Sequence, residues 1–361
     1  MESKLENKLI NEFLKERFVD AKVDNSGEIS VYSSVEKEYY SLKNGVGIKN
    51  SSRKLFLKLH GKDVLDFIHR ISTNNINNLN VNEKVETLFT NDKGRIIDKA
   101  TMMRFDYDFM LIGSPDENAR LHRWIDRYII SEDIKIRREN DNFMFEVCGP
   151  QAESYLTLIC GKFIDALDNK RIVNVNIEGL IFKIIKNEFQ SGLSNYWLFG
   201  EASVGIKLIE YLLNHVSVFD VQMVGETAHD VFRIENGIPI FPNEINDNYN
   251  PHELNLMHYV DFNKGCFIGQ EVIMRLDSYD KVQRKLVGVL FEGTPDDNEF
   301  DITVSGEIIG EITSTAYSHK MKKNIGLGLV RKNFAIEGKK YLAKNEKEKI
   351  EITITGLPFI K

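Results

Sequence analysis

One short stretch of the chain brings several chemically reactive residue types together. Residues 263–271 read NKGCFIGQE, so Lys264, Cys266, Gln270 and Glu271 supply an ammonium, a thiol, an amide and a carboxylate within one segment. Apolar residues at 272, 273 and 276 predict a short helix from residue 269 onward. Cys266 would then precede a helix N-terminus, where the helix dipole and Lys264 both favour thiolate. The segment is therefore a candidate for thiol chemistry.

The same residues also have an ordinary structural interpretation. A single cysteine in an intracellular protein is most often a small buried hydrophobic residue. Glu271 and Arg275, at i and i+4, form the kind of pair that solvated helices carry. No histidine is placed by sequence to act as a base for Cys266. Residue types alone leave both interpretations open.

Length and composition predict several domains and no broad nucleic-acid-binding surface. The 361 residues exceed an ordinary single core and predict two or three domains. The net charge of -7 makes direct nucleic-acid binding unlikely to be a main function. Three widely spaced cysteines fit a reducing compartment, so we expect the cytoplasm. No apolar run could span a bilayer and the N-terminus predicts no secretion signal, so we expect no membrane partner.

Hydrophobic periodicity predicts an α+β protein with three segments. Residues 1–43 predict a helix with an apolar stripe and a polar lead-in, and residues 44–280 alternate strands and helices. Residues 281–361 contain short strands separated by turns and predict a small all-β domain. The stripe of the N-terminal helix consists of Leu5, Leu9, Phe13 and Leu14.

A predicted hairpin places a carboxylate inside an apolar strand. Strands at 85–90 and 96–103 flank the turn 91–95, and Asp98 lies in the second strand. Its side chain either faces solvent or projects into a pocket, where burial would shift its pKa.

A helix at 227–236 raises a similar question. Thr227 suits its N-cap and Gly237 its end. Glu235 continues the buried stripe, so it either has a partner or a ligand or turns out to water. Arg233 lies off the stripe, where an arginine is ordinarily a solvated charge.

Several motifs resemble known families. The block KGCFIGQE at 264–271 resembles the K-G-C-[YF]-x-G-Q-E signature of the YgfZ-type folate-binding proteins, bacterial relatives of mitochondrial iron–sulfur cluster assembly factors. From about residue 44 to 361 the chain is similar to the glycine-cleavage T-protein superfamily, the tetrahydrofolate-dependent aminomethyltransferases. The similar pieces, in the superfamily's order, are GVGI at 45–48, NDKGRIID at 91–98, RIENGIP at 233–239, NPHE at 250–253 and KLVG at 285–288.

The resemblance implies an α+β fold in which a ring of T-protein-like subdomains surrounds a folate channel and a C-terminal β-barrel closes it. The implied cofactor is tetrahydrofolate or a derivative, whose pterin edge and glutamate tail need polar and charged partners. By resemblance, Asp98 acts on the reactive nitrogen of the folate, and Lys99 stands at an adjacent position that is acidic in T-proteins. The residues implied to bind folate are Arg233, Glu235, Glu253, Lys264, Gln270 and Glu271.

Two departures from the T-protein pattern favour the YgfZ-type branch. The G-Y-T-G-E segment of T-proteins is absent, because residues 186–195 read KNEFQSGLSN, although Glu188 could substitute for its glutamate. T-proteins also lack the cysteine of the signature block. The resemblance therefore implies a folate-binding accessory protein that supports assembly or repair of iron–sulfur enzymes, including those that modify tRNA, with assembly factors or client enzymes as partners.

The role of Cys266 follows from the number of ligands that a cluster needs. An iron–sulfur cluster normally takes four ligands. Cys266 alone forms no metal site, so it would share a cluster with a partner chain or act on a folate-linked intermediate. The alternative function is a tetrahydrofolate-dependent aminomethyltransferase with Asp98 as an electrostatic or acid–base partner. A structural adaptor with a vestigial channel is a third interpretation.

Overall fold

The computed structural model describes residues 3–24, 27–115, 118–188, 192–278, 282–296 and 299–360. Contacts divide the chain into two compact units. The first consists of residues 1–64, 78–85 and 101–229, and the second of residues 65–77, 86–100 and 230–361. This division differs from the three consecutive segments of the sequence analysis, because residues 1–43 belong to the first unit and residues 230–280 group with the C-terminal strands.

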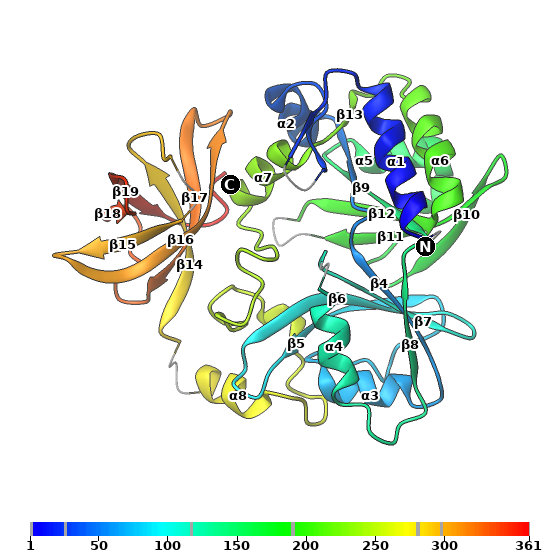
Figure 1. The fold of residues 1–361 in the computed structure, drawn as a ribbon, viewed down its shortest axis with the longest axis horizontal. Coiled ribbons are helices and arrows are strands. Elements are labelled where there is room, and N and C mark those ends of the chain that lie inside the picture. Colours follow the sequence, from blue (N-terminus) through cyan, green and yellow to red (C-terminus); the bar gives the residue numbers. More distant parts are fainter. Residues whose placement is uncertain are drawn as a thin grey trace. The chain divides into compact units, whose positions relative to one another are not determined.

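A six-stranded sheet with helices on one face forms the main core of the first unit (Figure 1). The strand order is β10-β11-β12-β9-β3-β13, and only the β13–β3 pair is parallel. Helices α1 and α6 lie side by side over this sheet, and their apolar residues join its buried face. The elements are α1 (Ser3–Arg17), β3 (Val46–Asn50), β9 (Asn142–Cys148), α5 (Ala152–Cys160), β10 (Ile172–Ile177), β11 (Leu180–Glu188), β12 (Ser194–Glu201), α6 (Ala202–Asn214) and β13 (Val221–Met223).

The predicted apolar stripe of the N-terminal helix is confirmed at Phe13 and Leu14 and wrong at Leu9, whose place Ile10 takes. Ile10 and Leu14 of α1 are fully buried, Phe13 packs against the same core, and Leu9 is 43% exposed. The side chain of Leu5 lies outside the described part of the chain. The smaller elements nearby are β1 (Lys22–Val23), β2 (Ile29–Val31), α2 (Val35–Asn44) and the 3-10 helix η1 (Lys162–Ala166).

A second sheet contains the predicted hairpin. Its order is β5-β6-β7-β4-β8. The strands β5 and β6 confirm the predicted strands at 85–90 and 96–103, and each extends slightly further. The elements are β4 (Leu55–His60), α3 (Val64–Ile71), β5 (Glu83–Thr90), β6 (Ile96–Arg104), β7 (Phe109–Gly113), α4 (Arg120–Asp126) and β8 (Lys135–Glu139).

The C-terminal strands close into a six-stranded barrel, drawn in orange and red in Figure 1. Its order is β14-β17-β16-β15-β18-β19, and Val289, Ile302, Ile309 and Ile352 belong to its apolar core. The predicted domain boundary at residues 280–281 lies outside the described residues. The strands are β14 (Arg284–Phe291), β15 (Phe300–Val304), β16 (Glu307–Ser318), β17 (Lys323–Arg331), β18 (Lys340–Lys344) and β19 (Lys349–Thr355).

Three helical elements precede the barrel: α7 (Glu226–Glu235), the 3-10 helix η2 (Met257–Tyr259) and α8 (Gln270–Ser278). Helix α7 begins at Glu226, so the predicted N-cap at Thr227 is wrong. The predicted end is confirmed, because Gly237 has φ +69° and Ile238 N–H donates to Arg233 O at 2.9 Å. Within the described ranges, no helix has the length and apolar character needed to cross a membrane.

Candidate functional site

One asparagine holds the turn between β5 and β6. Asn91 Oδ1 accepts the backbone N–H groups of Lys93 and Arg95, each at 3.0 Å, and Gly94 adopts φ +67°. Asp98 follows as the third residue of β6 and is only 2% exposed. Its Oδ1 accepts the Lys99 N–H at 2.8 Å. Of the two orientations left open by the sequence, the structure has the buried one.

Lys99, the residue after Asp98, is a cation that pairs with the carboxylate of Glu86. Its ammonium lies 2.9 Å from Glu86 Oε1 and donates to the Tyr259 hydroxyl at 2.7 Å. Burial acts to lower the pKa of Lys99, but Glu86 and Tyr259 outweigh it and raise the pKa above its ordinary value. Lys99 therefore stays charged near neutral pH. The position that is acidic in T-proteins here carries a lysine with its own carboxylate partner.

The segment 263–271 packs directly on the β5–β6 turn. Thr90 Oγ1 donates to Ile268 O at 2.6 Å. Gly269 has φ +84°, and a Cβ there would lie 2.5 Å from Asn91 O and 3.0 Å from Gly94 Cα. Only glycine combines this conformation with such a close backbone approach. The second glycine of the signature block is therefore required by packing against the turn that leads to Asp98.

Lys264 is a structural anchor and does not activate the thiol. Its buried ammonium donates to three backbone carbonyls: His69 O, Ser72 O at 2.5 Å and Asn74 O at 2.8 Å. Burial lowers the pKa of Lys264 to about 8. Three acceptors use all three hydrogens of the ammonium group. The ammonium group therefore ties residue 264 to the residues at the end of α3, and this contact does not depend on a thiolate or a folate.

Cys266 is exposed, which excludes the interpretation of a buried hydrophobic residue. His69, which was not a predicted site residue, lies near this part of the segment. A Cβ built on Gly265, the residue before Cys266, would be 3.9 Å from His69 Nε2. His69 Nδ1 accepts the Ile76 N–H at 3.2 Å, which leaves the proton on Nε2. Burial lowers the pKa of His69, and the Lys264 charge lowers it further. His69 is thus a neutral ring beside the residue that precedes Cys266.

Gln270 and Glu271 begin α8 next to this loop. Gln270 is half-buried, and its N–H donates to Phe267 O at 3.2 Å. Glu271 and Arg275 are both exposed, and the described residues contain no ion pair between them. His252 Nε2 lies 3.0 Å from Ile273 O and joins the helix to the NPHE segment. Gln270 and Glu271, both predicted to bind folate, are the first two residues of α8.

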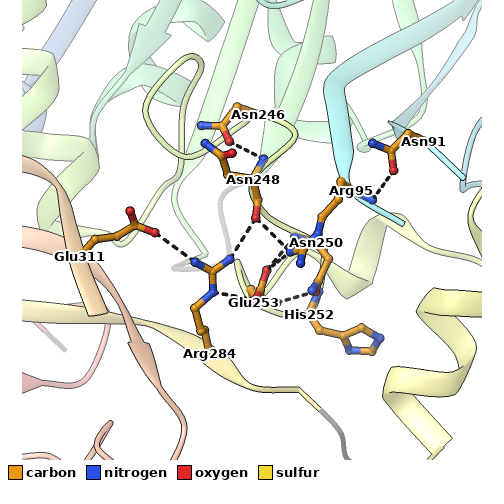
Figure 2. A network of polar contacts seen from close by, with 9 residues as sticks. All are labelled: Asn91, Arg95, Asn246, Asn248, Asn250, His252, Glu253, Arg284 and Glu311. Atoms are coloured by element: carbon orange, nitrogen blue, oxygen red, sulfur yellow. Dashed lines mark hydrogen bonds and ion pairs between the residues drawn. The ribbon is translucent and has the colours of Figure 1, made fainter. Parts of the chain in front are cut away.

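Glu253 is the centre of the network in Figure 2. It is 4% exposed, and its two carboxylate oxygens lie 2.9 Å from Arg95 Nη1 and from Arg284 Nε. Asn250 N–H also donates to it at 3.0 Å. Arg95 and Arg284 both donate to Asn248 O at 3.0 Å, and Arg284 continues to Glu311 at 3.1 Å. Glu253 is therefore already neutralised by two arginines, neither of which was a predicted site residue.

Arg233 is buried, so its interpretation as a solvated charge is wrong. It is 2% exposed and bonds Asp230 at 2.6 Å, Glu244 at 3.3 Å and Ser314 Oγ at 2.9 Å. Glu244, which is fully buried, also accepts from Ser314 Oγ at 2.7 Å and Thr313 Oγ1 at 2.5 Å. The ion pair joins α7 to the loop that contains Glu244, and the hydroxyls of Thr313 and Ser314 link it to β16 of the barrel.

Glu235 has a protein partner. It is 1% exposed and accepts the Ser318 hydroxyl at 2.6 Å, while its backbone carbonyl accepts the Phe359 N–H at 2.8 Å. Of the two alternatives for Glu235, the structure therefore has the buried, partnered one. Glu188, considered as a replacement for the missing T-protein glutamate, is exposed and accepts from Asn169 Nδ2 at 2.8 Å. Residues 189–191 of that segment lie outside the described residues.

All eight predicted site residues belong to the second unit, but in different roles. Arg233, Glu235, Glu253 and Lys264 are held in internal contacts, whereas Asp98 is a buried carboxylate at a turn and Cys266 is an exposed thiol. No group of three or more metal-ligating side chains occurs in the described ranges.

Comparisons with known proteins cover nearly the whole chain. A family model for the GCVT N-terminal domain matches residues 10–264, and one for the glycine cleavage T-protein C-terminal barrel domain matches residues 284–361. An aminomethyltransferase of Thermoanaerobacter pseudethanolicus is 23% identical over 337 residues, which cover 91% of this chain and 87% of that protein. One of Symbiobacterium thermophilum is 27% identical over 309 residues, covering 83% of this chain and 82% of that protein.

Among solved structures, the chain is similar to the glycine cleavage system aminomethyltransferase T from Bartonella henselae. The two share 20% sequence identity with a TM-score of 0.83, and the alignment covers 96% of each chain. At this identity the similarity establishes a shared fold.

Proposed function

Because this chain belongs to the glycine-cleavage T-protein family, we propose that it is a tetrahydrofolate-dependent one-carbon transferase of the aminomethyltransferase type. The observation that carries the proposal is Asp98, a carboxylate that is 98% buried in the strand after the Asn91–Arg95 turn. The relatives named aminomethyltransferase support the choice of reaction. All three cysteines are free, which supports action in the reducing cytoplasm.

The side chains present fit a reduced folate at Asp98. Asp98 offers a buried carboxylate, whose oxygens can accept hydrogen bonds from the N–H groups of a reduced folate. Arg233, Glu253 and Lys264 do not extend this fit, because their charged groups already bond Glu244, the two arginines and the three carbonyls. We therefore retain Asp98 and withdraw these three from the expected folate contacts.

Asp98 would act through its charge and its lone pairs. Tetrahydrofolate, when bound, supplies the ring nitrogen that accepts the one-carbon unit. A fixed carboxylate can hold or remove a proton at such a nitrogen, and shielding from water strengthens its interaction. The turn and the packed segment 263–271 fix the strand that carries Asp98, and Lys99 with Glu86 keeps the neighbouring charge balanced.

We expect Asp98→Asn to lose transfer activity by about 100-fold or more, because an amide cannot take a proton. Purified protein would be incubated with tetrahydrofolate and an aminomethylated lipoyl carrier, and methylenetetrahydrofolate would be measured. Asp92→Asn, at an exposed position of the same hairpin, is the matched control and should retain full activity. Wild-type protein that binds tetrahydrofolate but forms no product would contradict the reaction, and absence of folate binding would favour the adaptor interpretation.

The exposed Cys266 favours a second candidate function, a folate-binding accessory protein for iron–sulfur enzymes. Cys266 is the third residue of the segment KGCFIGQE, and its thiol is exposed. A partner chain can therefore contact this thiol, whereas it could not contact a buried one. One thiol supplies one of about four cluster ligands, so a partner protein would supply the others. This candidate rests on Cys266, whereas the first rests on Asp98.

Cys266→Ser should separate the two candidates. If the thiol serves an iron–sulfur partner, a deletion strain carrying this variant should lose activity of its [4Fe–4S] enzymes, while the purified variant keeps its fold and its transfer activity. Cys160→Ser, at a half-buried cysteine of the first unit, is the control and should rescue fully. Full rescue by Cys266→Ser would exclude the accessory role.

A further inference from the structure

The first unit contains a group of buried polar side chains on one face of its six-stranded sheet, next to an apolar cluster that includes Trp197. In the six-stranded sheet, Glu146 pairs with Trp197, Cys148 with Asn195, and Asn187 with Asn195. Directly paired residues, and residues two apart on one strand, share a face of a sheet. All five side chains therefore lie on one face. We call these residues the Glu146 face.

The carboxylate of this face is ionised and compensated. Ser51 Oγ donates to Glu146 Oε1 at 2.7 Å, Asn195 Nδ2 donates to Oε2 at 2.9 Å, and Lys54 Nζ lies 3.6 Å away. Burial acts to raise the pKa of Glu146, but Lys54 and other neighbouring charges outweigh it and hold the pKa well below its ordinary value. Cys148 donates its hydrogen to Asn195 Oδ1 at 3.1 Å, and burial raises its thiol pKa.

Two hydrogen-bond donors on the same face have no acceptor. Asn187 Nδ2 and Trp197 Nε1 are buried, and neither finds a partner among the residues that the structure describes. The Asn187 amide cannot be rotated to avoid this, because Lys84 Nζ donates to its Oδ1 and an ammonium can only donate. The two side chains are 6% and 8% exposed.

Unsatisfied buried donors are rare and destabilising. Trp197 on β12 pairs with Ile185 on β11, and Asn187 lies two residues further along β11. Trp197 and Asn187 are therefore diagonal neighbours, with backbones about 7–8 Å apart. Any group that satisfies the two donors must offer lone pairs, because both protein groups donate.

The charges around the two donors favour an anion. Lys84 contacts the Asn187 amide, and Lys54 Nζ lies 4.9 Å from the centre of a Trp197 ring. Glu146, the carboxylate of the face, accepts from Ser51 and Asn195 and lies 3.6 Å from Lys54, so the two lysines and one carboxylate named here leave a positive balance. We propose that the Glu146 face binds an organic carboxylate, whose oxygens accept from Asn187 Nδ2 and Trp197 Nε1. The residues of this face belong to the first unit, and the proposal does not rest on Asp98.

The two tryptophans of the chain make the site directly observable. Trp124→Phe leaves Trp197 as the single tryptophan, and the tryptophan emission of full-length protein would be titrated with acetate, with glycine and with 5-formyltetrahydrofolate. A saturable change is expected. Acetate and glycine test a free small acid. 5-Formyltetrahydrofolate would be compared with the same compound lacking its glutamate tail. A response to the first compound alone would identify the bound carboxylate as that of a folate tail.

Asn187→Asp is the decisive variant. Aspartate keeps an oxygen for Lys84 but replaces the donor with an acceptor, so carboxylate affinity should fall by about 10- to 100-fold. Asn174→Asp, the same change at an exposed position of β10, should leave affinity unchanged. If Asn187→Asp does not fold, Trp197→Phe keeps an aromatic ring without the N–H, and calorimetry should show the same loss.

Three results would overturn the proposal. They are the absence of a saturable response to acetate, glycine and 5-formyltetrahydrofolate, unchanged affinity in the Asn187 and Trp197 variants, and a carboxylate-soaked crystal in which only water contacts the two donors. Because none of these measurements depends on one-carbon transfer, failure here leaves the Asp98 proposal intact. Loss of transfer in Asp98→Asn conversely leaves the carboxylate titration unchanged.

Discussion

Gly269→Ala should destabilise the second unit by about 2–5 kcal/mol, combining a strained left-handed conformation with overpacking. The new Cβ would lie 2.5 Å from Asn91 O and 3.0 Å from Gly94 Cα, which are both backbone atoms and cannot swing away. The segment 263–271 must then separate from the β5–β6 turn. Urea denaturation would measure the loss, and exchange of the Arg95 amide, which bonds Asn91 Oδ1, would report on the turn.

The same motif supplies a matched control. Gly265 has no positive φ, and the nearest atom to a Cβ there is His69 Nε2 at 3.9 Å, an ordinary van der Waals distance. Gly265→Ala should therefore change stability by less than about 0.5 kcal/mol. Equal effects of the two substitutions would contradict the packing role assigned to Gly269.

Arg233→Met should cost about 3–5 kcal/mol, because it leaves the fully buried Glu244 without its cation. The hydroxyls of Thr313 and Ser314 remain as donors to Glu244, but they carry no charge. Denaturant unfolding followed by circular dichroism would measure the change. A loss below about 1 kcal/mol would show that these hydroxyls are sufficient to hold the carboxylate.

Two comparisons isolate the buried charge. The double variant Arg233→Met/Glu244→Leu removes both charges and should be more stable than Arg233→Met alone, since a buried pair can be replaced by apolar groups at small cost. Arg331→Met breaks an exposed pair with Glu307 and should have an effect below about 1 kcal/mol.

The hairpin, the end of α7 and the all-β character of the C-terminal segment were predictable because their patterns are local. Alternating apolar residues predict β5 and β6, and Gly237 ends α7 by its own conformation. A single barrel strand such as β18 is harder to place, because only Ala343 of its five residues is buried.

The site was predicted less well because charge partners come from distant parts of the chain. Arg233 pairs with Glu244, in an Asn- and Pro-rich loop, and with Ser314 of a barrel strand, and no local pattern distinguishes these from solvated residues. Lys264 bonds carbonyls near residue 70, which a sequence motif cannot encode. Asp98 was identified because its position depends only on the hairpin. Resemblance to the T-protein family supplied its chemistry.

The order of strands in the barrel has a consequence for synthesis on the ribosome. Strand β14, the first in sequence, pairs with β19, the last, so the barrel cannot close until residues 349–355 have left the exit tunnel. All segments of the first unit are complete by residue 229, whereas residues 65–77 and 86–100 belong with partners made much later. We expect residues 65–77 and 86–100 to stay unpacked until their later partners are made, and the edge of β14 to stay unpaired until β19 emerges. Nascent-chain chaperones would bind these exposed parts of the chain.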